Sequence, residues 1–430
     1  MNKTYKIAEA ETFLVDVPVS KEAFPFSVSY GRMDGLKRVF LKLTAENNEG
    51  KSIVGWGEAS PLYPYSNETP LSVYELLRFN YSNVIKGTEI DGSNIDTARK
   101  SIDGVLDKMQ KYLSRERLNF TQTAIDFALY DLAGKAAQVP AYRLLSDITS
   151  FNPIKACWST SSGSIDKAVE SAKEYLKKGY AIKIKLSGDI ESDSEITKKV
   201  LDESKKYQGA DIRADANAGY TPENFRRYCQ NVASRNDKSL LKTVDFYVEE
   251  PIDTREYGMD ALIDIIKQND FRIMADETLY TMDDAIALID KSSRAGVLDK
   301  LLFNIKVQKV GGLRNAMRVG NIAKQYGIPV MIGGMFPSSH GKLSNCHYAI
   351  ALGGVMASDG LHPSKDYIDT SASVVKNFQE LELMNDGSRI LDVFQDVHGF
   401  GSVIDEDVIR KNAINIDFGS YYPDFKGFKI

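Results

Sequence analysis

Alternating apolar and polar residues mark the start of the chain. The alternation covers residues 11–17, 38–44 and 53–58, and the turn sequence Asn47-Asn48-Glu49-Gly50 separates the last two. A period of two is typical of strands with one buried face, and a short polar turn joins neighbouring strands into a hairpin. The pattern predicts a small antiparallel sheet.

A helical pattern follows this sheet. Apolar residues recur at helical spacing over 102–112 and more regularly over 121–137, where Ala124 and Ala128 fall four residues apart. Pro140 ends the second helix, because proline cannot continue a helix. Residues 1–150 therefore predict a separate α+β domain.

The rhythm changes after about residue 153. Short apolar runs now alternate with amphipathic helices and recur about every 30 residues. One helix, 165–178, has Ser164 to cap its start and Gly179 to end it. The runs are 154–158, 181–186, 211–215, 244–250, 271–276, 301–306, 329–334 and 355–359.

Eight strand–helix units of this kind predict a (β/α)8 TIM-type barrel over 151–370. An open, doubly wound sheet is the alternative, but the chain lacks the glycine-rich GxGxxG and GxxxxGK[ST] phosphate loops. We expect the mixed residues 371–430 to pack back on the first domain.

Composition narrows the class of protein. The formal net charge of −5 argues against a nucleic-acid surface, and no apolar run approaches the roughly 18 residues of a membrane span. The chain begins without a hydrophobic signal region, and its cysteines, Cys157, Cys229 and Cys346, are far apart. These features predict a reduced, cytoplasmic protein that binds neither nucleic acid nor a membrane. They are compatible with an enzyme that has a small-molecule partner, and a homo-oligomer is left open.

Charged residues end five successive predicted strands. Any single one could be a surface charge, but five at matched positions would meet at the mouth of a barrel, where catalytic groups lie. Buried like charges repel, so the cluster needs counter-ions. The residues are Lys183 and Lys185, Asp215, Glu249 and Glu250, Asp276 and Glu277, and Lys306.

Three carboxylates on adjacent strands suit a hard cation such as Mg²⁺, with Mn²⁺ as the alternative. The chain has only 4 histidines, and none has zinc-ligand spacing. Lys183 and Lys185 are two apart and face the same way on a strand, so a nearby divalent cation would lower the pKa of at least one. Such a lysine could remove the proton next to a substrate carboxylate, with Lys306 opposite.

Several motifs carry a family resemblance over nearly the whole chain. Lys183-Ile184-Lys185 and the segments DANAGY, VEEP, MADET and NIKVQKVGGL, in this order, resemble the muconate-lactonizing subgroup of the enolase superfamily (the mandelate racemase/muconate lactonizing enzyme family), as do WGEASP and ALYDLAGKAAQVP nearer the N-terminus. Sites of this superfamily are a known case of a lysine or histidine base that works beside Mg²⁺. The resemblance implies Asp215, Glu249 and Asp276 as metal ligands, and Lys185, Lys306 and Lys183 as catalytic lysines.

The resemblance also implies that residues 1–150 form a capping domain, whose loops 24–31 and 60–65 select the substrate. Arg32 is the candidate for a distal anion. The chain has Met335-Phe336-Pro337 where relatives often carry a glutamate, and Asp359 alone where dipeptide epimerases show D-x-D. We interpret His340 as a residue that lines the pocket or supports the residues lining it, not as the base. The candidate substrate contacts are Phe26, Ser29, Tyr30, Arg32, Asn217, Met335, His340 and Asp359.

The predicted reaction is racemisation or epimerisation of an N-acyl amino acid or dipeptide-like substrate through an enolate. A dehydratase that forms o-succinylbenzoate (a carbon–oxygen lyase) and a muconate-type cycloisomerase remain alternatives. A Schiff-base lysine would leave the carboxylates unexplained. A non-catalytic relative is the remote alternative.

Overall fold

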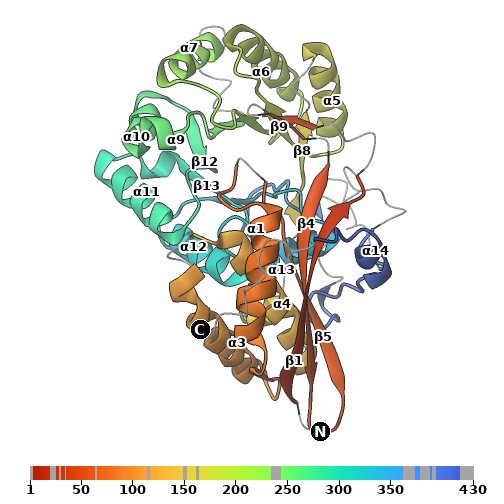
Figure 1. The fold of residues 1–430 in the computed structure, drawn as a ribbon. Coiled ribbons are helices and arrows are strands. Elements are labelled where there is room, and N and C mark those ends of the chain that lie inside the picture. The colour runs from red at the N-terminus through yellow and green to blue at the C-terminus, as the bar shows by residue number, and fades with distance from the viewer. Residues whose placement is uncertain are drawn as a thin grey trace.

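The computed structural model describes most of the chain. The described residues are 3–19, 26–28, 31–33, 35–62, 65–113, 117–148, 153–160, 164–233, 244–361, 373–377, 388–389 and 394–416. A parallel sheet wrapped by helices lies beside an N-terminal antiparallel sheet with its own helices (Figure 1). No helix among these residues is long and apolar enough to span a membrane.

The N-terminal sheet has the strand order β5-β4-β1-β6. It contains β1 (Thr4–Val17), β4 (Leu36–Glu46), β5 (Ser52–Ala59) and β6 (Glu89–Asp91), and the first three include the predicted strands. The predicted turn is closed by the Asn47 side chain, which accepts hydrogen bonds from the backbone of Glu49 and Lys51. A short hairpin of β2 (Phe26–Val28) and β3 (Gly31–Met33) stands apart from this sheet.

Helix α4 (Asn119–Ala137) packs directly on β5. Nearly every residue of this helix is buried, because it lies between the N-terminal sheet and the barrel. A Cβ atom added to Gly57 of β5 would lie 1.8 Å from the carbonyl oxygen of Ala124, so the two backbones touch. The other helical segments here are α1 (Pro70–Glu75), η1 (Leu76–Tyr81), α2 (Ser82–Ile85), α3 (Ile95–Leu113) and η2 (Ala141–Leu144).

The barrel sheet is parallel and confirms the predicted fold. Its strands are β8 (Cys157–Thr160), β9 (Ala181–Lys185), β10 (Asp211–Asp215), β11 (Asp245–Glu249), β12 (Arg272–Ala275), β13 (Leu301–Ile305) and β14 (Val330–Ile332). The helices between and around them are α5 (Ile165–Lys177), α6 (Ile190–Ser204), α7 (Pro222–Ala233), α9 (Thr254–Tyr257), α10 (Met259–Gln268), α11 (Met282–Ala295), α12 (Leu313–Gln325) and α13 (Ser339–Leu352), with a short η3 (Leu298–Lys300) before β13. As predicted, Ser164 caps α5 and Gly179, with a φ of 79°, follows its end.

The predicted eighth strand, 355–359, is not a regular strand, and this corrects the sequence analysis. Residues 356–360 still form single backbone hydrogen bonds to β14 on one side and to residues 155 and 157 on the other. They therefore take the place of an eighth strand in the barrel. The Ser358 hydroxyl interrupts the ladder, because it accepts the hydrogen bond from the Ile332 N–H. Gly353 and Gly354, which have positive φ, come just before the segment. The backbone bonds are Met356 N–Val330 O (2.7 Å), Gly360 N–Ile332 O (3.0 Å), Ser358 N–Lys155 O (2.9 Å) and Cys157 N–Ser358 O (3.3 Å).

Strand β7 (Ile154–Lys155) also departs from the prediction, because it pairs with β15 (Ser388–Arg389) as a separate antiparallel ribbon. The predicted first strand, 154–158, is thus split into β7 and β8, and only β8 joins the barrel sheet.

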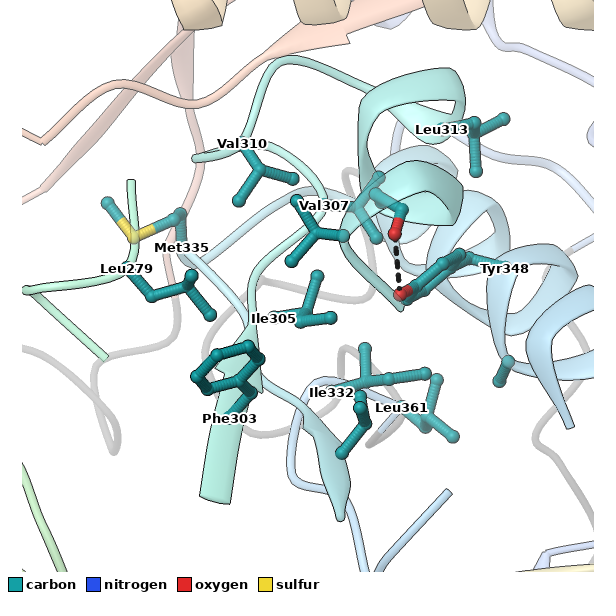
Figure 2. Close-up of a cluster of buried hydrophobic side chains, with 14 of the residues drawn as sticks. Leu279, Phe303, Ile305, Val307, Val310, Leu313, Ile332, Met335, Tyr348 and Leu361 are labelled. Atoms are coloured by element: carbon teal, nitrogen blue, oxygen red, sulfur yellow. Dashed lines mark hydrogen bonds between the residues drawn. The ribbon is translucent and has the colours of Figure 1, made fainter. Parts of the chain in front are cut away.

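Side chains of β13 alternate between two cores. Phe303 and Ile305 point to the outer core against the helices, where Figure 2 shows them near Ile332 and other apolar side chains. Leu302 packs in a separate inner cluster with Tyr247, Met274 and Met331. By the same alternation, Asn304 and the residue after Ile305 point to the inside of the barrel.

Four side chains of the N-terminal region each bond to two backbone groups of the barrel. They are buried and span long sequence distances, so they fix the contact between the two parts. The bonds run from Arg38 to the carbonyl oxygens of Met335 and Phe336, from Asn119 to those of Tyr280 and Lys309, to Glu58 from the N–H groups of Ser338 and Gly341, and to Asp126 from those of Leu313 and Arg314.

The C-terminal helix α14 (Glu406–Lys411) lies beside β1 (Figure 1). Ile414 donates a backbone hydrogen bond to Leu14, and Asp16 donates one to Asn412. The domain boundaries at 150 and 370 stay predictions.

Candidate active site

Five barrel strands deliver charged side chains to one edge of the sheet. Asp215 stands in register with Lys185 of β9 on one side and with Glu249 of β11 on the other. Asp276 and Lys306 directly follow β12 and β13. Because parallel strands end at the same edge, the side chains meet at one mouth of the barrel.

Lys183 is enclosed by carboxylates. Its ammonium lies 2.6 Å from Asp359 Oδ2, 3.1 Å from Asp215 Oδ2 and 3.1 Å from Glu249 Oε2, and its side chain is only 5% exposed. Burial opposes the charge, but Asp359, Glu249 and Asp215 outweigh it and raise the pKa of Lys183 well above its usual value. Lys183 is therefore held as a cation.

Lys185 lies nearer the mouth, with a side chain that is 19% exposed. Its Nζ is 2.6 Å from Asp215 Oδ2 and donates a hydrogen bond of 3.0 Å to Asn217 Oδ1. The Asn217 amide donates in turn to Glu277 Oε1 (3.3 Å).

Lys306, like Lys185, lies close to one carboxylate oxygen and one neutral oxygen. Its Nζ lies 2.6 Å from Asp276 Oδ2 and donates to the hydroxyl of Tyr65 (3.3 Å), a residue of the N-terminal domain. Lys309, which is fully buried, binds the other oxygen of Asp276 at 2.6 Å. Burial opposes the charge on Lys306, yet Asp276 and Glu277 raise the pKa of this lysine.

Asp215 and Asp276 hold matching negative charge, whereas burial and the neighbouring Asp215 raise the pKa of Glu249. Burial alone would raise the pKa of Asp215 and Asp276, but the adjacent lysines outweigh burial and lower both pKa values. Among protein groups alone, the carboxylates thus raise the pKa values of Lys183 and Lys306. The predicted lowering of a lysine pKa therefore requires the charge of a bound cation.

Sequence reasoning missed the polar residues one step deeper. Arg213 Nε lies 3.1 Å from Glu249 Oε2, and its Nη2 lies 3.2 Å from Asp359 Oδ2. Asn304 donates to Glu249 Oε1 at 2.7 Å. Arg213 is two residues before Asp215, and Asn304 is two before Lys306, so the period of the strand was the signal that could have found them.

The donor chemistry of the three predicted ligands fits a divalent cation. All three are oxygen donors, and Glu249 Oε2 and Asp276 Oδ2 are buried atoms that accept no hydrogen bond. Ammonium groups lie against these carboxylates, and no group of three His, Cys, Asp or Glu among the described residues is spaced to hold a metal ion. The ligand roles of Asp215, Glu249 and Asp276 stay predictions.

Half of the predicted substrate contacts cannot be placed. Ser29 and Tyr30 lie outside the described residues, as do the side chains of Phe26 and Arg32, whose backbones belong to the β2–β3 hairpin.

The structure places the other four candidates at different depths. Asn217 contacts Lys185, while Asp359 is bound to Lys183 and Arg213. Met335 is 1% exposed and packs in the apolar cluster near Leu279 (Figure 2).

The interpretation of His340 as a pocket residue needs correction. Its ring is fully buried, with Nδ1 2.9 Å from Ser402 Oγ and Nε2 2.9 Å from the carbonyl oxygen of Trp56. Both nitrogens are engaged, so His340 is a packing residue between α13, β5 and the C-terminal region.

Two family models match the chain. The model for the mandelate racemase / muconate lactonizing enzyme N-terminal domain covers residues 9–146, and that for the enolase C-terminal domain-like family covers 167–408. The chain belongs to the mandelate racemase/muconate lactonizing enzyme family of the enolase superfamily. The predicted family is confirmed.

Curated members of this family that resemble the chain are isomerases. A hydrophobic dipeptide epimerase of Citrifermentans bemidjiense is 25% identical over 82% of this chain and 88% of its own length. Muconate cycloisomerase 1 of Acinetobacter baylyi is 28% identical over 78% of this chain and 83% of its own length. These relatives support the prediction of an isomerase.

Solved structures of the family share the fold. A muconate lactonizing enzyme from Pseudomonas fluorescens, complexed with muconolactone, superposes with a TM-score of 0.75 at 22% identity over 95% of this chain and 100% of that one. A dipeptide epimerase from Enterococcus faecalis, complexed with Mg and the dipeptide L-Leu-L-Tyr, gives 0.71 at 24% identity over 92% and 99%.

Proposed function

We propose that this family member is a Mg²⁺-dependent racemase or epimerase that moves the proton on the carbon next to a carboxylate. The observation that carries the proposal is the placement of two lysines. Lys185 and Lys306 lie on β9 and just after β13, separated in the sheet by three strands that carry carboxylates. Their side chains are 19% and 11% exposed, whereas Lys183 and Lys309 are more deeply buried.

The two lysines divide the proton transfer. One amine takes the α-proton, so that a C–H bond breaks, an N–H bond forms and the electron pair stays on the substrate. The opposite ammonium then returns a proton to the other face. Two bases on opposite sides allow either enantiomer to react.

Asp215, Glu249 and Asp276 are the residues that would hold Mg²⁺, with Mn²⁺ as the alternative. A bound divalent cation supplies positive charge where negative charge develops on the substrate carboxylate. Lys183 holds Asp215, Glu249 and Asp359 in place, and Arg213 also contacts Glu249 and Asp359. Burial opposes the charge on Asp359, but Lys183 and Arg213 outweigh it and lower the pKa of this carboxyl.

The relatives suggest the substrate class. Several are dipeptide epimerases, and one solved structure is an N-succinyl Arg/Lys racemase. An N-acyl amino acid or a dipeptide-like carboxylate is therefore the proposed small-molecule partner. Three buried free cysteines agree with a reducing compartment such as the cytoplasm.

A muconate-type cycloisomerase or an o-succinylbenzoate-forming dehydratase is the second candidate. The likeness to muconate cycloisomerase 1 favours the first of these. Both reactions use one lysine as the acid or base, so they predict unequal importance of the two lysines, whereas racemisation needs both.

The test is exchange of the α-proton in D2O with a panel of N-acyl amino acids, dipeptides and muconate, with and without Mg²⁺. We expect metal-dependent exchange that EDTA abolishes. In Lys185→Ala and in Lys306→Ala, we expect a loss of about 10²- to 10⁴-fold in exchange of the enantiomer whose α-proton that lysine removes. Lys178→Ala, which removes an exposed lysine paired with Glu174, is the matched control. Full exchange of both enantiomers in either site variant would remove that lysine from the mechanism, and no exchange with any carboxylate would reject the function.

A further inference from the structure

Both proposed proton-transfer lysines have the same two kinds of partner. Each ammonium lies 2.6 Å from one carboxylate oxygen, Asp215 for Lys185 and Asp276 for Lys306. Each also donates a hydrogen bond to a neutral oxygen, Asn217 Oδ1 or the Tyr65 hydroxyl. We propose that Asn217 and Tyr65 are matched positioning residues, each of which aims one lysine at one face of the substrate; the inference rests on the proposed function.

The number of acceptors carries the argument. A neutral lysine amine has two N–H bonds and one lone pair in tetrahedral directions. A carboxylate and a neutral oxygen occupy two of these directions, through two hydrogen bonds at Lys185 and through an ion pair and a hydrogen bond at Lys306, so one direction is left for the lone pair. In the ammonium form the third N–H takes this direction, so the same two partners aim both the base and the acid.

Lys183 shows the contrast. Its ammonium contacts three carboxylates, so no N–H is left to point at a substrate. Lys183 thus stabilises charge, whereas among the described residues Lys185 and Lys306 each have one carboxylate and one neutral oxygen as partners, which leaves a third direction.

Asn217 is itself held in place. Its backbone has a φ of 44°, its N–H donates to Asp215 Oδ1 (3.0 Å), and its amide donates to Glu277 Oε1. Because the amide nitrogen is used in this way, the amide oxygen must face Lys185.

Tyr65 is held through the segment that follows it. Glu68 accepts hydrogen bonds from the N–H groups of Phe120 (2.7 Å) and Thr121 (2.9 Å), at the start of α4. The Tyr65 hydroxyl also donates to Asp276 Oδ1 (3.4 Å), and the Lys306 ammonium lies 5.1 Å from the centre of the Tyr65 ring. Within the part of the chain that the structure describes, the N-terminal domain therefore contributes a hydrogen-bond partner to Lys306, while the partners of Lys185 come from the barrel.

Opposite enantiomers should report on the two residues separately. We would measure α-proton exchange in D2O with Mg²⁺ for each enantiomer of an exchanging substrate, with wild type, Tyr65→Phe and Asn217→Gly. Glycine keeps the positive φ at 217 and removes only the side chain. Tyr326→Phe, at an exposed site, is the control.

We expect Tyr65→Phe to slow exchange of one enantiomer by about 10- to 100-fold in kcat, with little change in KM, and Asn217→Gly to slow the other. Equal effects on both enantiomers, or none, in variants that still melt like wild type would overturn the inference alone. No exchange by wild type would overturn the proposed function together with the inference.

Discussion

Strand β10 carries a carboxylate at each end, and the two are in opposite environments. Burial raises the pKa of Asp211, at the start of the strand, so its charged form is disfavoured. Asp215, at the end, is also buried, but Lys185 and Lys183 outweigh burial and lower its pKa. Of the two, Asp215 is the one kept ionised, as a cation ligand must be.

The pair offers a matched test of the metal site. Asp215→Asn should weaken Mg²⁺ binding by about tenfold or more, because a charged oxygen donor is lost. Asp211→Asn, the same change at the opposite end of the same strand, should leave the affinity unchanged. Titration calorimetry measures both, and equal affinities of the two variants would exclude Asp215 as a ligand.

The sequence predicted the charged residues that lie at the ends of the strands and point into the barrel mouth, because charges at strand ends stand out against apolar runs. It did not predict that Arg213 and Asn304 contact Glu249, since both lie inside the predicted strands 211–215 and 301–306 and not at their ends. Their partners come from other strands, and only the closed barrel brings them together.

At the scale of elements, the contact of β5 with α4 is made by backbone. Gly55 and Gly57 face the carbonyl oxygens of Ala128 and Ala124, at 2.4 and 1.8 Å from an added Cβ. The alternation in 53–58 predicted β5, and the alanines spaced four residues apart in 121–137 predicted α4. Neither pattern predicted that the backbones of β5 and α4 touch, because the spacing of hydrophobic residues does not show which face of the strand packs against the helix.

Gly57→Ala should therefore destabilise the protein by about 1–3 kcal/mol or more, since the new methyl group meets fixed backbone. Gly104→Ala, on the exposed face of helix α3 with nothing within 4 Å, should instead stabilise by about 0.5–1 kcal/mol. Urea unfolding compares the two. A Gly57→Ala midpoint equal to that of wild type would contradict the packing described.

The eighth segment of the barrel shows what the pattern of apolar residues does not predict about an element. Residues 355–359 have the pattern of a strand, yet a serine hydroxyl replaces part of the backbone ladder. Whether a serine hydroxyl or a backbone carbonyl accepts the hydrogen bond depends on which of the two faces the neighbouring strand. The pattern of apolar residues is the same in both cases.

At the scale of the whole molecule, Asp126 joins the two parts of the fold. It lies on α4 and accepts the N–H groups of Leu313 (2.7 Å) and Arg314 (3.2 Å), at the start of α12 in the barrel. Burial raises the pKa of this carboxyl to about 7, although the two backbone hydrogen bonds act in the opposite direction.

This shift predicts how stability changes with pH. An unfolded aspartate titrates near pH 4, so between about pH 4 and about pH 7 the folded chain holds a proton that the unfolded chain lacks. The contribution is fully present below about pH 4 and is lost as pH rises through about 7. Between about pH 5 and about pH 7, the free energy of unfolding should fall by about 2 kcal/mol more in wild type than in Asp126→Asn.

Chemical denaturation at the two pH values measures this difference. The asparagine variant cannot ionise but keeps one acceptor oxygen, so it serves as the reference for wild type. Parallel pH dependence of the two proteins would show that Asp126 titrates normally in the folded state.

Arg38, Glu58, Asn119 and Asp126 all address main-chain atoms of the barrel. Every amino acid except proline offers the same carbonyl and amide groups, so these bonds do not depend on which side chains the barrel segments carry. Space and charge restrict some positions of those segments instead: a Cβ atom added to Gly312 would lie 2.5 Å from Asp126 Cγ, and Arg314 pairs with Asp103 and Asp107. Substitutions on the barrel side should therefore be tolerated where they add no bulk against the four supporting side chains and break no such pair, whereas the supports themselves should not vary.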